Sequence, residues 1–547
     1  MSSPLTSPDA PPPTAAESLV SGLVRNGLSR LFTLPGVQND HLHDALHGAR
    51  EMIDIVHTRH EQGAAYMALG ATMATGGPAG CCVVPGPGVL NAGAALATGW
   101  AVGAPMLCIT GNLPAAAIGR QYGMLHEIAD QAGLLAGLTK WSGQIARPEE
   151  AGWVVDAAFA QLRTGRPRPV AIAAPLDVWP ARAEQTPSAA PVVVPALDVA
   201  AIGRAADWLD AARCPAILVG GGAQSCAAEV RALAERLQAP VISYRMGRGV
   251  LDSRHPLALD AYGGHLMCAE VDVVIAIGTR AQTPMQVWGT DAGMRVIHVE
   301  IDPDEMARIR TPDLAIADDA ARVLPALLAA LPNRVRAAAD FAAVRARTLA
   351  ETAHLAPQRA WLEAIRAALP EDGKAIFDIT QLGHVSRIFW PVYQPRSFLD
   401  SGYQGTLGWG FATGLGAQRA CPGVPVVAVC GDGGFLFTMP ELATAAQFDI
   451  PLVTIVMNDN AYGNVRRTQV EEFGNRTIGS DLRNPDFGAL AASFGIAAHR
   501  ATSPEALRVS LRAALERRAP AVIEVPVGPM PSPWNRLRFR RVRGVAG

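Results

Sequence analysis

The sequence has 547 residues, of which 49% are apolar and only 18% are charged, and this composition excludes an intrinsically disordered protein. Its 47 lysines and arginines against 49 aspartates and glutamates give a net charge of 47 − 49 = −2, so no positive field attracts nucleic acid or an anionic membrane. The length favours about three domains.

The eight cysteines form no C-x-x-C pair, and most of them stand in apolar runs. This usage favours reduced thiols in the core of a cytoplasmic protein over disulfides or a zinc site. Residues 1–15 are polar and proline-rich and lack the basic and apolar regions of a signal peptide. We therefore expect a disordered leader.

The first block of alternating strand and helix patterns spans 16–185. Within it, 89–110 carries no charge and is long enough to span a bilayer. Glycine and proline interrupt this stretch, and the run from CCVV through an alanine-rich segment to MLCIT has the pattern of strand, helix and strand. Strands buried on both faces of a parallel sheet are nearly continuously apolar, so a buried α/β segment is favoured over a membrane span.

Two further blocks follow a proline-rich linker at 184–196. The second block, 197–335, contains short β-branched runs punctuated by glycine or proline, which is typical of βαβ units. Its Gly-Gly-Gly-Ala at 220–223 lacks the rest of a dinucleotide fingerprint. The third block, 355–530, has a size and rhythm similar to the first. The sequence thus predicts an α/β protein of three doubly wound parallel-sheet domains.

Residues 531–547 form a basic C-terminal tail that contains five arginines, at 536, 538, 540, 541 and 543. The sequence allows two interpretations of this tail. One is a solvated or subunit-facing segment, and the other is a binding site for an anion.

A carboxylate follows a buried strand of the third block. The strand VVAVC runs into Gly431-Asp432-Gly433-Gly434, and the next apolar strand ends at Asn458-Asp459-Asn460. Successive strands of a parallel sheet end at the same edge, where α/β sheets bind ligands. Oxygen ligands from two strand ends suit Mg²⁺, and glycines let the backbone approach a phosphate that the metal bridges. The alternative is a pair of acidic turn residues that cap helices.

This combination of GDGGF and NDN resembles the cofactor motif of thiamine-diphosphate (ThDP) enzymes of the acetohydroxyacid (acetolactate) synthase, pyruvate oxidase and benzoylformate decarboxylase superfamily. Other matching segments occur in family order: RHEQGAAYMA (59–68), the glycine- and alanine-rich run 85–111, HVEIDPDE (298–305) and GTLGWGFATGLGA (405–417). The resemblance covers 18–530. It implies, in chain order, a pyrimidine-binding, a central Rossmann-like and a diphosphate-binding domain.

Carried over residue by residue, the resemblance implies a Mg²⁺ ion bound by Asp432, Asp459 and the carbonyl of Ala461. Family members usually have asparagine at 459, so an ionised Asp459 would add a charge that attracts Mg²⁺ and opposes the diphosphate. Asn458 and Asn460 are alternatives to Asp459 as the ligand. The same match implies that the diphosphate contacts a further set of residues: Gln381, Gly431, Gly433, Gly434, Tyr462 and Gly463.

Glu61 in RHEQGA matches the family's glutamate, which binds N1′ of the cofactor's aminopyrimidine and promotes the tautomer that activates C2. The alternative is a glutamate that the helix dipole favours at a helix start. Leu407 matches the bulky residue under the bent cofactor, and Gly405 would offer its carbonyl to the 4′-amino group. In the family the two cofactor-binding domains come from different subunits, so the resemblance implies a homodimer or homotetramer with active sites between subunits.

The resemblance leaves the outcome of the reaction open. His126 in LHEIADQ stands where the synthases carry glutamine; it could relay protons, and a structural histidine is the alternative. Thr468 replaces a substrate-selecting tryptophan, and 278–287 lacks the flavin-site element of the biosynthetic synthases, so FAD is not favoured as a cofactor. Arg466 and Arg467 would either meet a substrate carboxylate or remain solvated.

We therefore predict an acetolactate-synthase-like enzyme that uses ThDP and Mg²⁺ to decarboxylate a 2-oxo acid and transfers the acyl unit to an aldehyde or ketone acceptor. One alternative is a decarboxylase that releases an aldehyde without ligation. Another is a catalytically idle ThDP-binding paralogue, against which the intact Glu61 counts. A flavin or nicotinamide oxidoreductase is disfavoured because Gly-Gly-Gly-Ala lacks its companion motif. Neither nucleic acid nor a membrane is expected as a partner.

Overall fold

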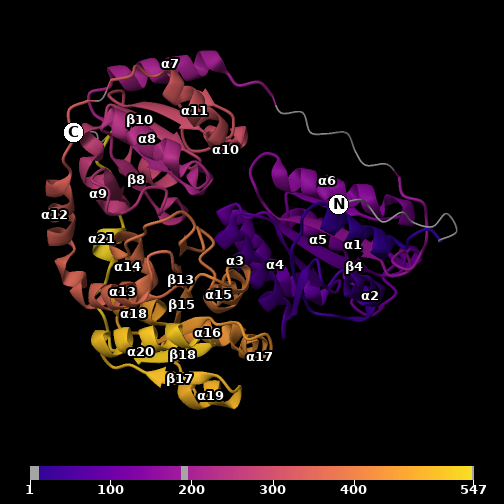
Figure 1. The fold of residues 1–547 in the computed structure, drawn as a ribbon. Coiled ribbons are helices and arrows are strands. Elements are labelled where there is room, and N and C mark those ends of the chain that lie inside the picture. The colour runs from indigo at the N-terminus through magenta and orange to yellow at the C-terminus, as the bar shows by residue number, and fades with distance from the viewer. Residues whose placement is uncertain (1–10, 187–194, 335, 545–547) are drawn as a thin grey trace. The chain divides into compact units, whose positions relative to one another are not determined.

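The computed structural model describes residues 11–186, 195–334 and 336–544. Most of the expected leader, most of the expected linker and the last three residues of the tail lie outside these ranges. The chain divides into two compact units: one runs to residue 193 and includes 415–420, and the other contains the remainder. The first unit holds one sheet and the second unit holds two (Figure 1).

The sheet of the first unit has six parallel strands in the order β2-β1-β3-β4-β6-β5. The strands are β1 Arg30–Thr33, β2 Asp54–His57, β3 Ala79–Val83, β4 Met106–Asn112, β5 Trp141–Gln144 and β6 Val170–Pro175. The helices are α1 Ala15–Arg25, α2 Asp40–Gly48, α3 Glu61–Thr75, α4 Pro87–Val102, α5 Gln131–Leu138 and α6 Ala151–Arg163. Helix α1 begins where Thr14 and Glu17 form a reciprocal capping box.

The long uncharged stretch of the first block folds as strand, helix and strand, as predicted. Every residue of β3 and β4 is buried, and α4 lies between them. Pro87 begins this helix, and Gly103, with φ at 70°, ends it in the left-handed conformation that glycine adopts without strain. Across the described residues, no helix combines the length and the apolar character that a bilayer span requires.

The second sheet has the strand order β12-β11-β10-β7-β8-β9 and is also parallel. Its strands are β7 Pro215–Val219, β8 Val241–Ser243, β9 Ala258–Asp260, β10 Val273–Ile277, β11 Arg295–Val299 and β12 Leu314–Ile316. The accompanying helices are α7 Val199–Ala211, α8 Ala227–Leu237, α9 Ala261–Met267, α10 Pro303–Met306, α11 Ala320–Ala330 and α12 Ala342–Glu351. Read from one edge to the other, this is the strand order of a doubly wound Rossmann sheet.

The third sheet has the order β14-β13-β15-β16-β18-β17, with all pairs parallel. Its strands are β13 Lys374–Phe377, β14 Phe398–Leu399, β15 Val426–Gly431, β16 Val453–Asn458, β17 Ala497–Arg500 and β18 Ala521–Pro526. The remaining helices are α13 Ala356–Ala368, α14 Gln381–Phe389, α15 Trp409–Ala420, α16 Asp432–Thr438, α17 Leu442–Gln447, α18 Gly463–Glu472, α19 Phe487–Ser493, α20 Pro504–Arg517 and α21 Trp534–Leu537.

The first and third sheets share one topology. Numbered from the first strand of each sheet, both have the order 2-1-3-4-6-5, which explains the similar rhythm of the two blocks in the sequence. The prediction of an α/β protein with three parallel, helix-flanked sheets is confirmed. In the third sheet the strand order reverses between β13 and β15, and doubly wound sheets bind ligands at such a switch point.

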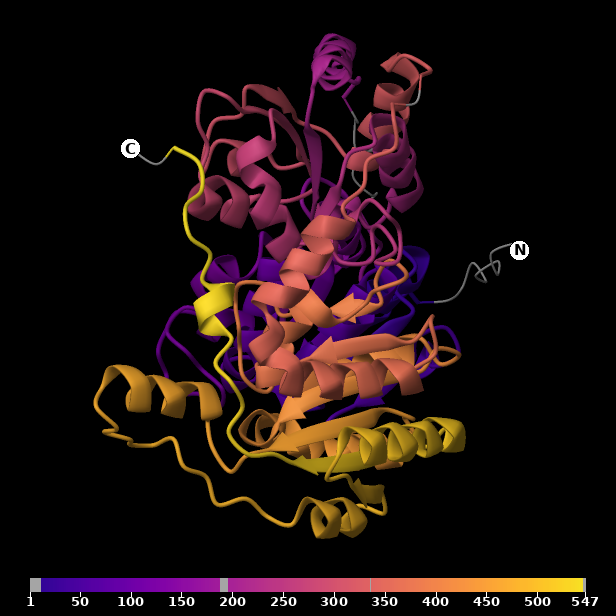
Figure 2. The ribbon, with the colours of Figure 1, turned by 90° about the vertical axis from the view of Figure 1, so that its left-hand side faces the viewer.

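The basic tail packs against the second unit in part, while its Arg538, Arg540 and Arg541 are exposed. Figure 2 shows the segment after β18 running along one side of this unit, from the third sheet towards the helices of the second. Arg543 belongs to a tail that was predicted to be solvated or subunit-facing, or else to bind an anion. Its side chain is 7% exposed; it pairs with Asp291 at 2.9 Å and donates to the Cys268 carbonyl. Because a buried charge is stable only when paired, Arg543 anchors the end of the described tail.

All eight cysteines lie within the described residues, and none of them forms a disulfide. Burial raises the pKa of Cys82 in β3 and of Cys226 to about 12. These thiols therefore remain protonated near neutral pH, as the sequence predicted for a reduced core.

Candidate active site

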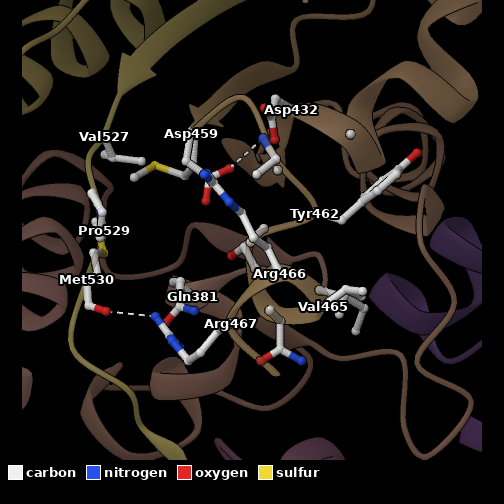
Figure 3. Close-up of a pocket in the computed structure, with 18 of the residues that line it drawn as sticks. Gln381, Asp432, Asp459, Tyr462, Val465, Arg466, Arg467, Val527, Pro529 and Met530 are labelled. Atoms are coloured by element: carbon white, nitrogen blue, oxygen red, sulfur yellow. Dashed lines mark hydrogen bonds between the residues drawn. The ribbon is translucent and has the colours of Figure 1, made fainter. Parts of the chain in front are cut away.

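A cavity of about 760 Å³ opens at the carboxyl edge of the third sheet. Residues directly after β13, β15, β16 and β18 contribute to its wall, so the cavity lies at the switch point of the sheet. The wall contains most of the residues that the sequence assigned to the cofactor: Gln381, Leu407, Gly431, Asp432, Gly433, Gly434, Asp459, Ala461, Tyr462 and Gly463. Figure 3 shows this cavity in close-up.

Asp432 is buried where β15 meets α16, with 2% of its surface exposed. Burial raises the pKa of its carboxyl, and hydrogen bonds from backbone N–H groups and from the Asn484 amide partly oppose that rise. A carboxylate in this position is costly unless a cation meets it.

Asp459 follows β16 and lines the same cavity. Burial and the negative charge of Asp432 together raise the pKa of Asp459 to about 6. Two carboxylates that repel each other in a buried site are stabilised by a shared divalent cation, and Mg²⁺ prefers oxygen ligands of this kind. Across the described residues, no cluster of three or more His, Cys, Asp or Glu side chains is placed to bind a metal, so further ligands here would be carbonyl, phosphate or water oxygens.

The two asparagines beside Asp459 have other contacts. Asn458 donates to Glu524 at 2.8 Å and accepts from Asn484 at 2.9 Å. Asn460 adopts a left-handed conformation, with φ at 53°, in the turn after the strand. Of the three residues of NDN, Asp459 is the one in the cavity wall, next to Ala461, which is 6% exposed. These contacts favour Asp459 over its neighbours as the metal ligand.

Asn484 is a site residue that the sequence analysis missed. Its Nδ2 donates to Asp432 Oδ2 at 2.6 Å, to Asn458 at 2.9 Å and to Asn460 at 3.3 Å. The segment before it pairs with the NDN loop, since Tyr462 donates to the Ser480 carbonyl at 2.8 Å. One amide therefore joins both strand ends of the site. Asn484 lies in an ordinary loop sequence, so no local signal marks it.

Two glycines in the cavity wall allow close packing that a side chain would prevent. A Cβ on Gly433 would lie 2.5 Å from the Tyr462 ring, and a Cβ on Gly463 would lie 2.3 Å from an Asp459 carboxylate oxygen. Both distances are shorter than any real Cβ contact. The acidic pair and the adjacent carbonyl supply the oxygen ligands that fit a divalent cation, and the two glycines let the chain around them pack closely.

Leu407 and Gly405 lie on the loop that precedes α15. Leu407 is half-buried and lines the cavity, whereas Gly405 is exposed and has a φ of 60°. Asp378 packs against this loop: a Cβ on Gly410 would lie 2.8 Å from the Asp378 Cβ, and burial raises the pKa of Asp378 to about 7. The sequence analysis did not single out Asp378, although it follows an apolar strand just as Asp432 does.

Glu61 and His126 belong to the first unit, where both follow strands of the first sheet. Glu61 begins α3, its side chain is 12% exposed, and its Oε2 accepts from the Asn91 amide at 3.0 Å. His126 has a left-handed backbone, with φ at 67°, and its Nδ1 lies 2.9 Å from Gln38 Oε1. The carbonyl of His126 lies so close to Gly86 that a Cβ there would be 2.2 Å away.

Three family models of thiamine pyrophosphate enzymes match this chain, one in each of its three sheet-containing parts. The N-terminal TPP binding domain of thiamine pyrophosphate enzymes matches residues 13–134, the central domain matches 202–327 and the C-terminal TPP binding domain matches 378–525. A probable 2-ketoarginine decarboxylase of Pseudomonas aeruginosa is 36% identical over 94% of each chain.

Two acetolactate synthases are also similar along most of their length. The probable large subunit of Methanocaldococcus jannaschii is 33% identical over 94% of this chain and 92% of its own. The isozyme 1 large subunit of Escherichia coli is 30% identical over 94% of this chain and 93% of its own. The chain therefore belongs to the thiamine pyrophosphate enzymes and is a ThDP-dependent enzyme related to acetolactate synthases.

Proposed function

We propose that the protein decarboxylates a 2-oxo acid and transfers the acyl unit to a second carbonyl compound, with ThDP and Mg²⁺ as cofactors. The pair of the buried Asp432 and the half-buried Asp459 in the wall of the cavity carries this proposal, because two adjacent carboxylates call for a divalent cation, and they lie in the range that matches the C-terminal TPP binding domain. When bound, ThDP supplies a nucleophilic carbon and an electron sink for loss of CO₂.

The residues of the cavity have separate roles in this proposal. Asp432, Asp459 and the Ala461 carbonyl hold Mg²⁺. Backbone N–H groups hold the diphosphate, and Leu407 supports the bent cofactor. The residues around the diphosphate are Gln381, Gly431, Gly433, Gly434, Tyr462 and Gly463, and Gly405 offers its carbonyl to the 4′-amino group.

Glu61 holds a proton at N1′ of the aminopyrimidine. As in the family, Glu61 and Asp432 of one active site come from different subunits, so we propose a homodimer or homotetramer in the cytoplasm. His126 is proposed to move a proton during turnover. The central domain is not proposed to bind FAD.

Simple decarboxylation with release of an aldehyde is the second candidate. The relative described as a 2-ketoarginine decarboxylase is more similar than the two synthases, at 36% against 33% and 30% identity, and favours this candidate. Ligation is favoured by the synthase relatives. A catalytically idle copy is disfavoured because Glu61 is present and is held by Asn91.

A product analysis decides between these functions. Purified protein is incubated with ThDP, Mg²⁺ and a panel of 2-oxo acids, with and without added aldehydes, and CO₂ and organic products are measured. CO₂ with an acyloin or acetohydroxyacid product is the result expected for ligation, and CO₂ with aldehyde alone would select decarboxylation. Failure to release CO₂ from any member of the panel would favour the idle copy.

Replacing Asp459 by asparagine, the usual family residue, is expected to flatten a pH dependence. In the wild type, Asp459 must lose its proton to bind the metal, so Mg²⁺-dependent ThDP affinity rises as pH rises through about 6. With Asp459→Asn this step disappears, so the affinity should depend less on pH over this range. Calorimetric titration between pH 5 and 8 measures the effect.

The cofactor-free protein provides a second measurement of the same group. Because the folded-state pKa of Asp459 is raised, its contribution to stability is present at low pH and is lost as pH rises from the ordinary carboxyl range through about 6. The wild-type melting temperature should therefore fall more steeply over this range than that of Asp459→Asn. Asp449→Asn, the same change in an exposed turn, is the control. Identical profiles for all three proteins would contradict the assignment.

A further inference from the structure

The cavity wall contains a positively charged side chain that the cofactor roles proposed above leave unused. Arg467 lies on α18, and its side chain is 13% exposed. Figure 3 shows it beside Gln381 and Met530, on the side of the cavity away from Asp432. The adjacent Arg466 is half exposed and pairs with Asp481 at 3.2 Å. Both arginines line the cavity, and Arg467 is the more buried of the two.

The contacts of Arg467 use only part of its hydrogen-bonding capacity. Nη2 donates to the Met530 carbonyl at 2.7 Å. With Oε1 of Gln381 facing the guanidinium, Nη1 and Nη2 donate to it at 2.7 and 3.1 Å. Glu471 Oε1 lies 3.9 Å from Nε, which is an ion-pair distance but too long for a hydrogen bond. Of the five N–H groups, the Nε–H and one Nη1–H thus have no hydrogen-bond acceptor within the described parts of the chain.

This arrangement favours an anion in the cavity. Burial lowers the pKa of Arg467, yet an arginine remains charged at neutral pH, and Glu471 is half exposed to water. Apolar side chains line the same cavity, including Leu382, Val465 and Val470. A fixed guanidinium with free donors beside apolar walls binds an oxyanion more strongly than one in water does.

Two oxyanions would enter this cavity: the diphosphate of the cofactor and the carboxylate of the substrate. The diphosphate must lie against the metal ligands Asp432 and Asp459. Arg467 lies on the side of the cavity away from Asp432 (Figure 3), although it also contacts Gln381, which is proposed above to contact the diphosphate. We propose that Arg467 binds the carboxylate of the 2-oxo acid. This inference rests on the proposed function.

The chemistry of decarboxylation fixes how this contact acts on the kinetics. The bond between the carboxyl carbon and the acyl carbon breaks, CO₂ leaves as a neutral molecule, and the electron pair of the bond remains on the acyl carbon. Negative charge therefore moves away from Arg467 as the reaction proceeds. The arginine stabilises the bound substrate at least as much as the transition state, so its loss should raise KM without lowering kcat.

The test compares Arg467→Met, Arg467→Lys and Arg231→Met in the full-length protein loaded with ThDP and Mg²⁺. Arg231 lies on α8, its side chain is 62% exposed, and it pairs with Glu235, so it controls for the loss of a charge. With the best 2-oxo acid of the panel, KM should rise about ten- to hundredfold in Arg467→Met, with kcat within about threefold of the wild type. Arg467→Lys should give a smaller rise, and the control none.

Calorimetric titration with ThDP separates the two oxyanions. An unchanged Kd for ThDP in Arg467→Met is expected, whereas a Kd that weakens by the same factor as KM would assign Arg467 to the diphosphate and overturn the proposal. An unchanged KM would also overturn it. If Arg467→Met does not fold, an unchanged KM in folded Arg467→Lys has the same meaning. If the wild type releases no CO₂ from any 2-oxo acid, the proposed function itself is rejected. That result differs from an active wild type whose KM does not change when Arg467 is replaced, which rejects only the role of Arg467.

Discussion

Glu61→Gln is expected to lower turnover by about 10²- to 10³-fold while ThDP remains bound. Glutamine keeps the size of the side chain and can accept the hydrogen bond that the Asn91 amide donates to Glu61 at 3.0 Å. It cannot exchange a proton with N1′ of the aminopyrimidine, so the step that activates the cofactor is lost while the other contacts persist. Steady-state kinetics with saturating ThDP, together with calorimetric titration of the cofactor, measures both parts of this expectation.

Glu51→Gln is the matched control, because Glu51 belongs to the same unit and its side chain is 88% exposed. The control should keep full turnover, and melting temperatures should show that both variants are folded. Full turnover in Glu61→Gln would show that Glu61 only begins a helix, which is the simpler explanation of an acidic residue at the first position of α3.

Asp432→Asn should weaken Mg²⁺-dependent binding of ThDP by about a hundredfold or more. The substitution removes one of the two carboxylates that are proposed to bind the metal and replaces it by a neutral amide. The stability of the folded, cofactor-free protein should not decrease. Burial and the repulsion between the two carboxyls raise the pKa of Asp459, so removing one charge relieves a cost in the cofactor-free protein. A melting temperature at or above that of the wild type, combined with lost cofactor binding, is the expected pattern.

Asp207→Asn, a substitution of the same kind at an exposed position of α7, should change neither quantity. A low melting temperature in Asp432→Asn would mean that the carboxylate stabilises the fold, through its hydrogen bond from Asn484 for example. Unchanged ThDP affinity at every Mg²⁺ concentration would remove Asp432 from the metal site.

The central strands and the class of the fold could be predicted from the sequence, because β3, β4, β15 and β16 are predominantly apolar and a proline stands one or two residues before each of them. Edge strands were harder to predict from the sequence than central ones. β5 (WSGQ) and β17 (AAHR) alternate between half-buried and exposed residues and carry polar side chains, so they resemble loops until the neighbouring strand pairs with them.

Some residues of the candidate site could likewise be predicted from the sequence, and others could not. Asp432 and Asp459 could be found because each directly follows an apolar strand, and parallel strands end at one edge. Asn484 and Glu524 could not, since they reach the site from distant positions through side-chain hydrogen bonds. The ion pair of the buried Arg543 with Asp291 depends on a tail that reaches another sheet, and composition alone describes this tail only as basic.

In the proposed enzyme, each active site combines Glu61 of one subunit with the Asp432 and Asp459 pair of another. Co-expression of Glu61→Gln and Asp432→Asn chains with different affinity tags, followed by isolation of the doubly tagged species, tests this combination directly. A doubly tagged dimer holds one site with both native carboxylates, so it should recover about half of the wild-type turnover although each variant alone is nearly inactive. A doubly tagged species that is assembled and folded but as inactive as its parents would contradict an active site shared between subunits.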